Sequence, residues 1–103
     1  MYFAIFWKVN PSKVAEVIKM ATEGKFSYPK EVKSIVEYAT LDGTFYVEIV
    51  EAENREIVYS HLAPYICKQV HLFDKVDIFP VVPIKDLFAS SDKIQREKNR
   101  LSH

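Results

Sequence analysis

Apolar and polar positions alternate on both sides of Asp42-Gly43, over residues 32–41 and 44–50. Alternation with a period of two is typical of strands that bury one face. Asp-Gly tolerates the positive φ angles of a type I′ turn, so the pair predicts a tight β-hairpin with a two-residue loop. The turn then sets the register of the two strands.

Two further patterns precede the hairpin. Residues 2–9 are aromatic and β-branched on both faces, which is typical of a central strand. Asn10-Pro11 then predicts the start of a helix, because asparagine caps the first turn and proline lacks only an N–H that would be unpaired there. Apolar residues recur at helical spacing up to residue 21, and Gly24 fits the end of this helix.

A second helix and a last strand follow the hairpin. The acidic stretch around Asn54 suits a helix start, and an apolar stripe runs from Ile57 to Leu62. Pro64 is expected to break or kink this helix. Residues 76–82 have the pattern of a strand, and the prolines in and beside it indicate an edge position or a bulge.

The resulting order is strand-helix-strand-strand-helix-strand. It predicts an α+β, ferredoxin-like βαββαβ fold, in which a four-stranded antiparallel sheet carries two helices on one face. We expect one domain at residues 1–88 and a charged tail at residues 89–103, either a frayed helix or disordered. Two helices cover only one face of the sheet. What contacts the other face, solvent or a second chain, therefore helps to distinguish the possible functions.

The register also predicts which side chains share a face of the sheet. The more apolar face of the hairpin is expected under the helices, where it would join Phe3, Ile5 and Trp7 of the first strand. This hairpin face consists of Val36, Tyr38, Thr40, Phe45, Val47 and Ile49. The opposite face is then mixed, and a solvated face rarely needs aromatic rings. We therefore expect it to contact a second copy of the chain through Phe6 and Tyr46.

Three charged residues on this second face form a candidate polar cluster, namely Lys8, Glu37 and Glu48. The register places the two glutamates opposite one another, an unfavourable pairing that Lys8 would relieve. Buried against a second chain, the cluster would have shifted pKa values and act as an acid–base group. A structural salt-bridge patch is the alternative and the more common arrangement.

A candidate ligand pocket lies between the helices and the predicted sheet. Its residues are Trp7, Tyr38, His61 and Tyr65. Ligand pockets usually combine mostly apolar walls with a few polar groups, and this set supplies both. Ordinary core packing, with the polar tips of the aromatic residues reaching the surface, is the alternative.

Composition narrows the function classes. The chain has 14 basic and 14 acidic residues, which argues against a nucleic-acid or acidic-membrane footprint over the whole surface. The lone Cys67 excludes an internal disulfide, and no apolar run reaches membrane-spanning length. Without a recognisable signal peptide, we expect a cytoplasmic protein with no membrane partner.

The histidines and the cysteine of the chain do not predict a metal site or a reactive thiol. His61, Cys67 and His71 do not have the spacing of a zinc site, so we expect no metal and no cofactor. As a nucleophile, Cys67 would need a base such as His71, one helical turn away. A small buried apolar role for the thiol is the simpler interpretation.

RNA binding is a third hypothesis, because RNA-recognition motifs share this order of elements. Gly43, Tyr46 and Val47 fit the aromatic motif of their third strand. Asp42 replaces a basic residue of that motif, and Thr44 removes a stacking ring. The two glutamates of the polar cluster would also repel phosphate.

Several short pieces of the chain resemble an uncharacterised family of small dimeric α/β-barrel proteins, described as a domain of unknown function. The pieces are Phe3, Trp7, Asp42-Gly43, Ile49–Ala52, Ala63–Tyr65 and Pro80–Val82. Phe45-Tyr46, Pro83 and the basic tail depart from the family's pattern. The resemblance implies a ferredoxin-like fold and a homodimer whose sheets pack together, and it brings no catalytic residues.

The sequence therefore predicts a homodimer that binds a small, partly apolar ligand between sheet and helices. More distant relatives of the same architecture include cofactor-independent monooxygenases, haem-degrading enzymes and isomerases. An enzyme of that class, a cofactor-independent or haem-type monooxygenase or an isomerase, is the alternative, and this step is an analogy of fold.

Overall fold

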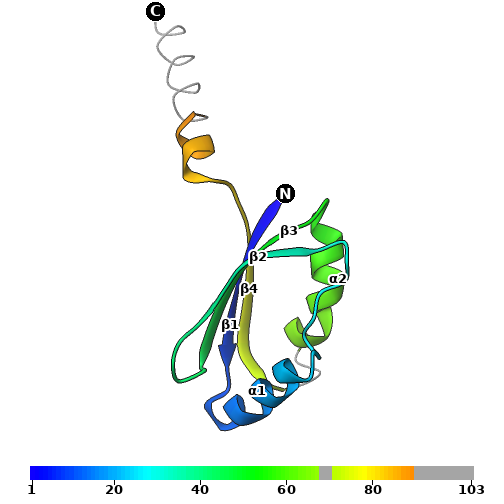
Figure 1. The fold of residues 1–103 in the computed structure, drawn as a ribbon, viewed down its shortest axis with the longest axis vertical. Helices are drawn as coiled ribbons and strands as arrows, with labels where there is room; N and C mark the ends of the chain where they lie inside the picture. Colours follow the sequence, from blue (N-terminus) through cyan, green and yellow to red (C-terminus); the bar gives the residue numbers. More distant parts are fainter. Residues whose placement is uncertain (68–70, 90–103) are drawn as a thin grey trace, which may run out of the picture.

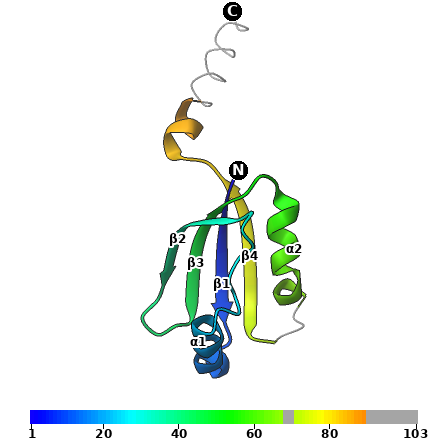
Figure 2. The same ribbon diagram turned by 45° about the vertical axis from the view of Figure 1, so that its right-hand side comes forward.

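The computed structural model describes residues 1–67 and 71–89. Its elements are β1 (Tyr2–Val9), the 3-10 helix η1 (Pro11–Lys13), α1 (Val14–Thr22), β2 (Lys33–Ala39), β3 (Phe45–Glu51), α2 (Arg55–Ile66) and β4 (Phe73–Val81). The four strands form one antiparallel sheet in the order β2-β3-β1-β4 (Figure 2). The predicted ferredoxin-like βαββαβ fold is confirmed.

The hairpin has the predicted register and a different turn. Glu37 pairs with Glu48 and Tyr38 with Val47, as a two-residue loop would require. The loop is nevertheless longer, because the Gly43 N–H donates to the Thr40 carbonyl at 2.9 Å. Gly43 has φ +74°, while no described residue other than His71 and the two described glycines has a positive φ, so a type I′ turn is excluded.

Asp42 holds this turn together with its side chain. Its Oδ1 accepts hydrogen bonds from the Thr40 hydroxyl at 2.7 Å, the Thr44 hydroxyl at 2.7 Å and the Thr44 N–H at 3.0 Å. A short acceptor side chain that bonds its own backbone two residues on is the usual reason for aspartate in a turn. These hydrogen bonds, with Thr40 first, lower the pKa of Asp42 from 3.8 to about 2.

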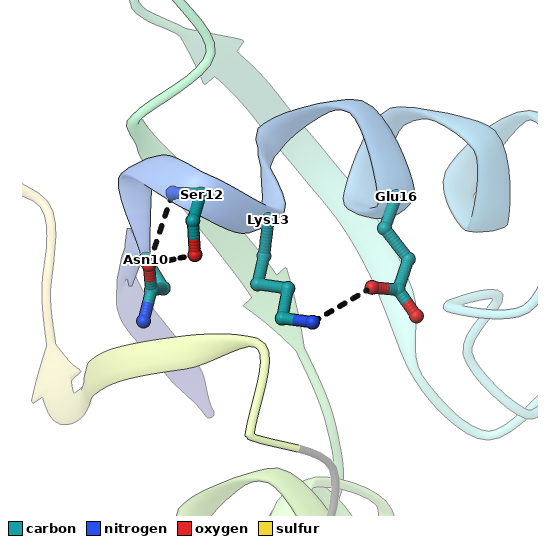
Figure 3. A network of polar contacts seen from close by, with 4 residues as sticks. All are labelled: Asn10, Ser12, Lys13 and Glu16. Carbon is teal, nitrogen blue, oxygen red and sulfur yellow. Dashed lines mark hydrogen bonds and ion pairs between the residues drawn. The ribbon is translucent and has the colours of Figure 1, made fainter.

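The helix after β1 begins as predicted. Asn10 Oδ1 accepts from the Ser12 N–H at 3.0 Å and from the Ser12 hydroxyl at 2.7 Å, and Lys13 pairs with Glu16 one turn later (Figure 3). Gly24 ends the segment with φ +75°, as expected of a residue after a helix.

Pro64 was predicted to break or kink α2, and the break is wrong. Asn54 caps the first turn by accepting from the Ile57 N–H at 3.1 Å, and the helix runs through Pro64 to Ile66. Proline in the last turn of a helix removes only one hydrogen bond, which the end of a helix tolerates better than its middle. The α2 helix lies along the sheet beside β4, whereas α1 crosses one end of the sheet (Figures 1 and 2).

The last strand, β4, occupies the edge that its prolines predicted, and begins three residues earlier than expected, at Phe73. After it, residues 84–89 form a helical segment that stands away from the sheet (Figure 1). Residues 90–103 lie outside the described residues, so the predicted character of the tail stays a prediction.

The hydrophobic core lies between the sheet and α2. Its largest fully buried side chains come from β1, β3 and α2 and from the segment leading into β4. They are Phe3, Ile5, Val9, Val50, Val58, Leu62 and Leu72. The prediction that Phe3, Ile5 and Trp7 face the helices is confirmed, since all three are buried in this core.

The faces of the hairpin are the reverse of the prediction. Paired residues of antiparallel strands share a face, and β1 pairs Trp7 with Tyr46 and Ile5 with Glu48. Tyr46 and Glu48 therefore lie on the helix side of the sheet, together with Glu37. The apolar set that includes Tyr38, Phe45 and Val47 lies on the other side, which we call the open face.

Candidate functional site

A cavity of about 400 Å³ opens on the helix side of the sheet. Its walls come from α1, from the segment between α1 and β2, and from β1, β2, β3 and the start of β4. The lining residues are Trp7, Val17, Ala21, Phe26, Ser27, Glu37, Tyr38, Ala39, Tyr46, Glu48 and Phe73. This size is within the range of small-molecule sites, and the mixture of aromatic walls with a few polar groups is typical of them.

Trp7 forms the inner wall of the cavity. Its ring packs edge-on against Tyr65 with 5.8 Å between centroids, and in a tilted arrangement against Phe73 with 4.8 Å between centroids. Trp7 is only 6% exposed, and its indole N–H is buried without a hydrogen-bond partner among the described residues. A buried donor without a partner is costly, so this N–H is a place where a bound molecule would gain a hydrogen bond.

Glu48 supplies the acceptor on the same wall. Tyr28, from the segment between α1 and β2, donates its hydroxyl to Glu48 Oε2. Burial raises the pKa of Glu48, the hydrogen bond from Tyr28 opposes this, and the negative charge of Glu37 adds to the rise. The Trp7 N–H is near enough to favour the charged carboxylate, but it does not reach hydrogen-bond geometry with it. Burial and the Glu48 charge also raise the pKa of Tyr28, which stays a neutral donor.

The charged residues that line this cavity are two glutamates, and no positively charged lining residue balances them. Glu37 lies directly opposite Glu48 and accepts a hydrogen bond from the Ser34 hydroxyl at 2.8 Å. None of the lining residues is lysine, arginine or histidine. The wall therefore offers acceptors and negative charge, and its donors are neutral.

The four predicted pocket residues do not share one cavity wall. Trp7 lines the cavity, whereas Tyr38 belongs to the open face by its register, is 71% exposed and only borders the cavity from the edge strand β2. Tyr65 packs behind Trp7 against Phe26, with 5.4 Å between ring centroids, and does not line the cavity.

His61 also lies behind the wall. Its ring packs on Tyr28 with 4.7 Å between centroids. Burial lowers the pKa of His61, and a hydrogen bond to the Phe26 backbone partly opposes this effect. His61 therefore supports the tyrosine that binds Glu48 rather than facing the cavity.

The predicted polar cluster is not formed. Lys8 pairs with Phe45 of β3 and Lys75 of β4, which places it on the open face. Glu37 and Glu48 lie on the other side of the sheet, so Lys8 does not join them. The cause is the register between β1 and β3, which no local turn determines.

The open face is strongly apolar. Phe6, Phe45 and Phe79 are about half exposed there, and Phe6 packs on Phe79 with 5.9 Å between centroids. A hollow of about 610 Å³ opens at one end of this face and includes Tyr38 and Val47 in its wall. Of the two predicted contact aromatics, Phe6 lies on this face, and Tyr46 points to the cavity side.

Charged side chains share the open face with this apolar area. Lys8 and Lys75 lie at one end of it, and Lys75 forms an ion pair with Asp77 at 3.4 Å. Both signs of charge are present, so the open face does not carry a uniformly basic field.

Metal and membrane features are absent from the part of the chain that the structure describes. Residues 1–67 and 71–89 contain no group of three or more potential metal ligands. Cys67 is exposed rather than buried as expected. Over the same residues, no helix is long and apolar enough to cross a membrane.

Tyr28 and Phe26 lie between α1 and β2, in a segment for which the sequence predicted no functional residue. Their only signal was two aromatic residues in a short polar stretch, next to Pro29. Glu37, Tyr46 and Glu48 were found, but on the wrong face.

Comparison with solved structures shows a shared fold. A 5-chloro-2-hydroxyhydroquinone dehydrochlorinase from Burkholderia phenoliruptrix, solved in complex with 2,5-dihydroxybenzoquinone, is 20% identical, with a TM-score of 0.53 over 80% of this chain and 94% of that chain. An antibiotic biosynthesis monooxygenase is 18% identical, with a TM-score of 0.50 over 81% of this chain and 100% of that chain. The fold is that of dimeric α/β-barrel proteins.

Comparison at the level of sequence gives the family. No curated protein matches the chain. The family model described as "Domain of unknown function (DUF3303)" matches residues 1–95. Because this match spans most of the sequence, the chain belongs to the DUF3303 family.

Proposed function

We propose that this protein binds a small, partly apolar molecule in the cavity between the sheet and α1. The observation that carries the proposal is the wall of the cavity, where the buried Trp7 N–H, without a hydrogen-bond partner among residues 1–67 and 71–89, lies beside the partly buried carboxyl of Glu48. A core without a ligand function would pair or exclude such groups, because buried polar groups are costly when unpaired.

Trp7 makes this proposal directly testable, since it is the only tryptophan of the chain. Small molecules that copurify with the protein would be extracted and identified by mass spectrometry, then titrated back while the fluorescence of Trp7 is recorded. Binding in the cavity is expected to quench or shift this emission.

A matched pair of alanine-to-leucine substitutions on α1 supplies the control. Ala21 lines the cavity, and Ala15 is exposed on the same helix outside it. Ala21→Leu is expected to narrow the cavity and weaken binding, whereas Ala15→Leu is expected to leave it unchanged. Equal binding by both variants, or purified protein that neither carries nor binds any small molecule, would contradict the proposal.

The protein acts, in this proposal, as a homodimer that buries the open face. Exposed apolar rings over three strands support this, because single chains rarely expose large continuous apolar patches. Phe79→Glu places a charge within the patch, beside Phe6, and is expected to yield monomers by light scattering. Glu53→Gln, at an exposed position after β3, is the control. A wild-type chain that is monomeric and binds single-stranded RNA would instead favour the RNA-binding hypothesis.

Catalysis is the second candidate, favoured by the hydrogen bond between Tyr28 and Glu48 at the cavity. A partly buried carboxyl with a raised pKa is suited to accept a proton from a bound substrate. This candidate corresponds to a cofactor-independent monooxygenase or an isomerase, and predicts that Glu48→Gln abolishes turnover while the ligand still binds. Oxygen consumption and product analysis with the extracted ligand would test it.

A further inference from the structure

We infer that the cavity selects a neutral hydroxylated aromatic ring, whose hydroxyl oxygen accepts a hydrogen bond from the Trp7 indole and donates one to the Glu48 carboxylate. The inference rests on the proposed ligand-binding function and specifies the chemical class of the ligand. It depends on three features of the cavity, which are its donor, its acceptor and its charge.

The donor is the indole N–H of Trp7. It belongs to a side chain that is 6% exposed, forms part of the cavity wall and has no partner among the described residues. An indole N–H can only donate, so the ligand atom beside it must be an acceptor.

The acceptor is the Glu48 carboxylate. Tyr28 donates to its Oε2, which leaves lone pairs free for a second donor. Glu48 and Trp7 are diagonal neighbours on one face of β1 and β3, since Ile5 pairs with Glu48 and Tyr46 with Trp7. Such neighbours lie within reach of one shared atom when their side chains are long. A hydroxyl oxygen is such an atom, because it accepts and donates at once.

The charge of the wall excludes two other ligand classes. An aromatic acid would place its carboxylate beside Glu37 and Glu48, with no lysine, arginine or histidine lining the cavity to compensate. An arylalkyl ammonium ion would match the two carboxylates but would leave the Trp7 N–H unpaired, since an ammonium group has no acceptor. The aromatic rings of Trp7, Phe26 and Phe73 on the wall favour a planar ring as the apolar part.

Four simple probes separate these classes in calorimetric titrations of the full chain. Catechol carries the hydroxyls, 1,2-dimethoxybenzene carries the same oxygens without donors, benzoate is anionic and benzylamine is cationic. We expect catechol to bind at least about tenfold more tightly than each of the other three, because each lacks a hydrogen bond or meets repulsion.

Variants assign the selectivity to the two named groups. Glu48→Gln keeps the shape and removes the charge, and Trp7→Phe keeps an aromatic ring and removes the donor. Glu48→Gln is expected to weaken catechol about tenfold and to reduce its advantage over 1,2-dimethoxybenzene, which makes no hydrogen bond to Glu48. Trp7→Phe is expected to weaken both probes, because the oxygens of both would accept from the indole N–H. Glu53→Gln is the matched control, since Glu53 is exposed and outside the cavity wall. Thermal melting checks that each variant is folded, and the probe series on the unmodified chain remains decisive if one is not.

The outcomes separate this inference from the proposed function. Equal binding of catechol and 1,2-dimethoxybenzene, with loss of both in Ala21→Leu, would overturn the inference and leave ligand binding in place. Tighter binding of benzoate or benzylamine would also overturn it. If none of the four probes binds and no molecule copurifies, the proposed function fails, and the inference fails with it.

Discussion

Gly43 lies in the hairpin turn against α1, and replacing it tests how closely α1 packs on this turn. Its φ of +74° lies in the region that side chains rarely adopt. A Cβ at this position would lie 2.9 Å from Val14 Cγ1, 3.6 Å from Ile18 Cδ1 and 3.7 Å from the Tyr46 hydroxyl. Gly43→Ala therefore strains the backbone and pushes α1 away from β3.

Two terms determine the size of the effect. An alanine at positive φ costs about 1–2 kcal/mol, of which about 0.4–1 kcal/mol is offset because the unfolded chain loses freedom. Contact with Val14 adds about 1 kcal/mol, at the lower end of the range for overpacked sites, because a side-chain methyl group can shift. We expect Gly43→Ala to lower the free energy of unfolding by about 2 kcal/mol.

Gly24 is the matched control, because it shares the backbone conformation and lacks the close contact. Its φ is +75°, and a Cβ there would meet only Ser27 Oγ, at 3.5 Å. Gly24→Ala should therefore show the backbone cost alone, about 1 kcal/mol or less. Urea unfolding at one fixed protein concentration, followed by Trp7 fluorescence, measures both variants.

The double variant Val14→Ala/Gly43→Ala isolates the contact. Removing Cγ1 of Val14 should make Gly43→Ala no more costly than Gly24→Ala, since the remaining neighbours lie at ordinary contact distances. If Gly43→Ala and Gly24→Ala destabilise equally in the original background, the close packing of α1 on the hairpin turn is refuted.

Three further predictions concern titrating groups. Asp42 has a pKa lowered from 3.8 to about 2, so its contribution to stability is present above pH 3.8 and is lost as the pH falls toward 2; the stability advantage over Asp42→Asn should shrink across that window in urea titrations, and a constant advantage would contradict the hydrogen bonds of the turn. Glu48 has a raised pKa, so its ionisation disfavours the fold; Glu48→Gln should gain stability relative to the unmodified chain as the pH rises from about 4 to 7, and an unchanged difference would show that Glu48 is solvated. His61 has a pKa lowered from 6.5 by burial, so NMR titration should find its imidazole neutral at pH 6.5, and a predominantly charged ring there would contradict its packing on Tyr28.

The local signals in the sequence were sufficient for the order of elements. Asn10 and Asn54 both cap helices with their side chains, as the preference of short polar residues for that position predicted. Asp42-Gly43 gave the correct hairpin register, although the turn is longer than two residues. A four-residue loop from Leu41 to Thr44 preserves the same pairs as a two-residue loop, so register and turn type are separate predictions.

The faces of the sheet required information that is not local. No turn connects β1 to β3, so the pairing of Trp7 with Tyr46 follows from long-range packing alone. The sequence analysis assumed that the more apolar side of the hairpin faces the helices. In the structure, α2 lies beside β4, and α1 crosses the end of the sheet (Figure 2). The helix side of the hairpin therefore borders a cavity, where Glu37 and Glu48 are tolerated.

Because of this reversal, the polar residues of the hairpin need hydrogen-bond partners on the cavity side, and its apolar residues need a contact surface on the open face. Polar residues on a face that borders a cavity are satisfied by neighbours such as Tyr28 and, in our proposal, by a ligand. Apolar rings such as Phe6 and Phe79 on the open face pack on one another but stay about half exposed, because no described helix covers them. Successive side chains of β1 and β3 point to opposite sides of the sheet. A substitution on the open face should therefore change dimer formation and leave ligand binding intact, and a substitution on the cavity side should do the reverse.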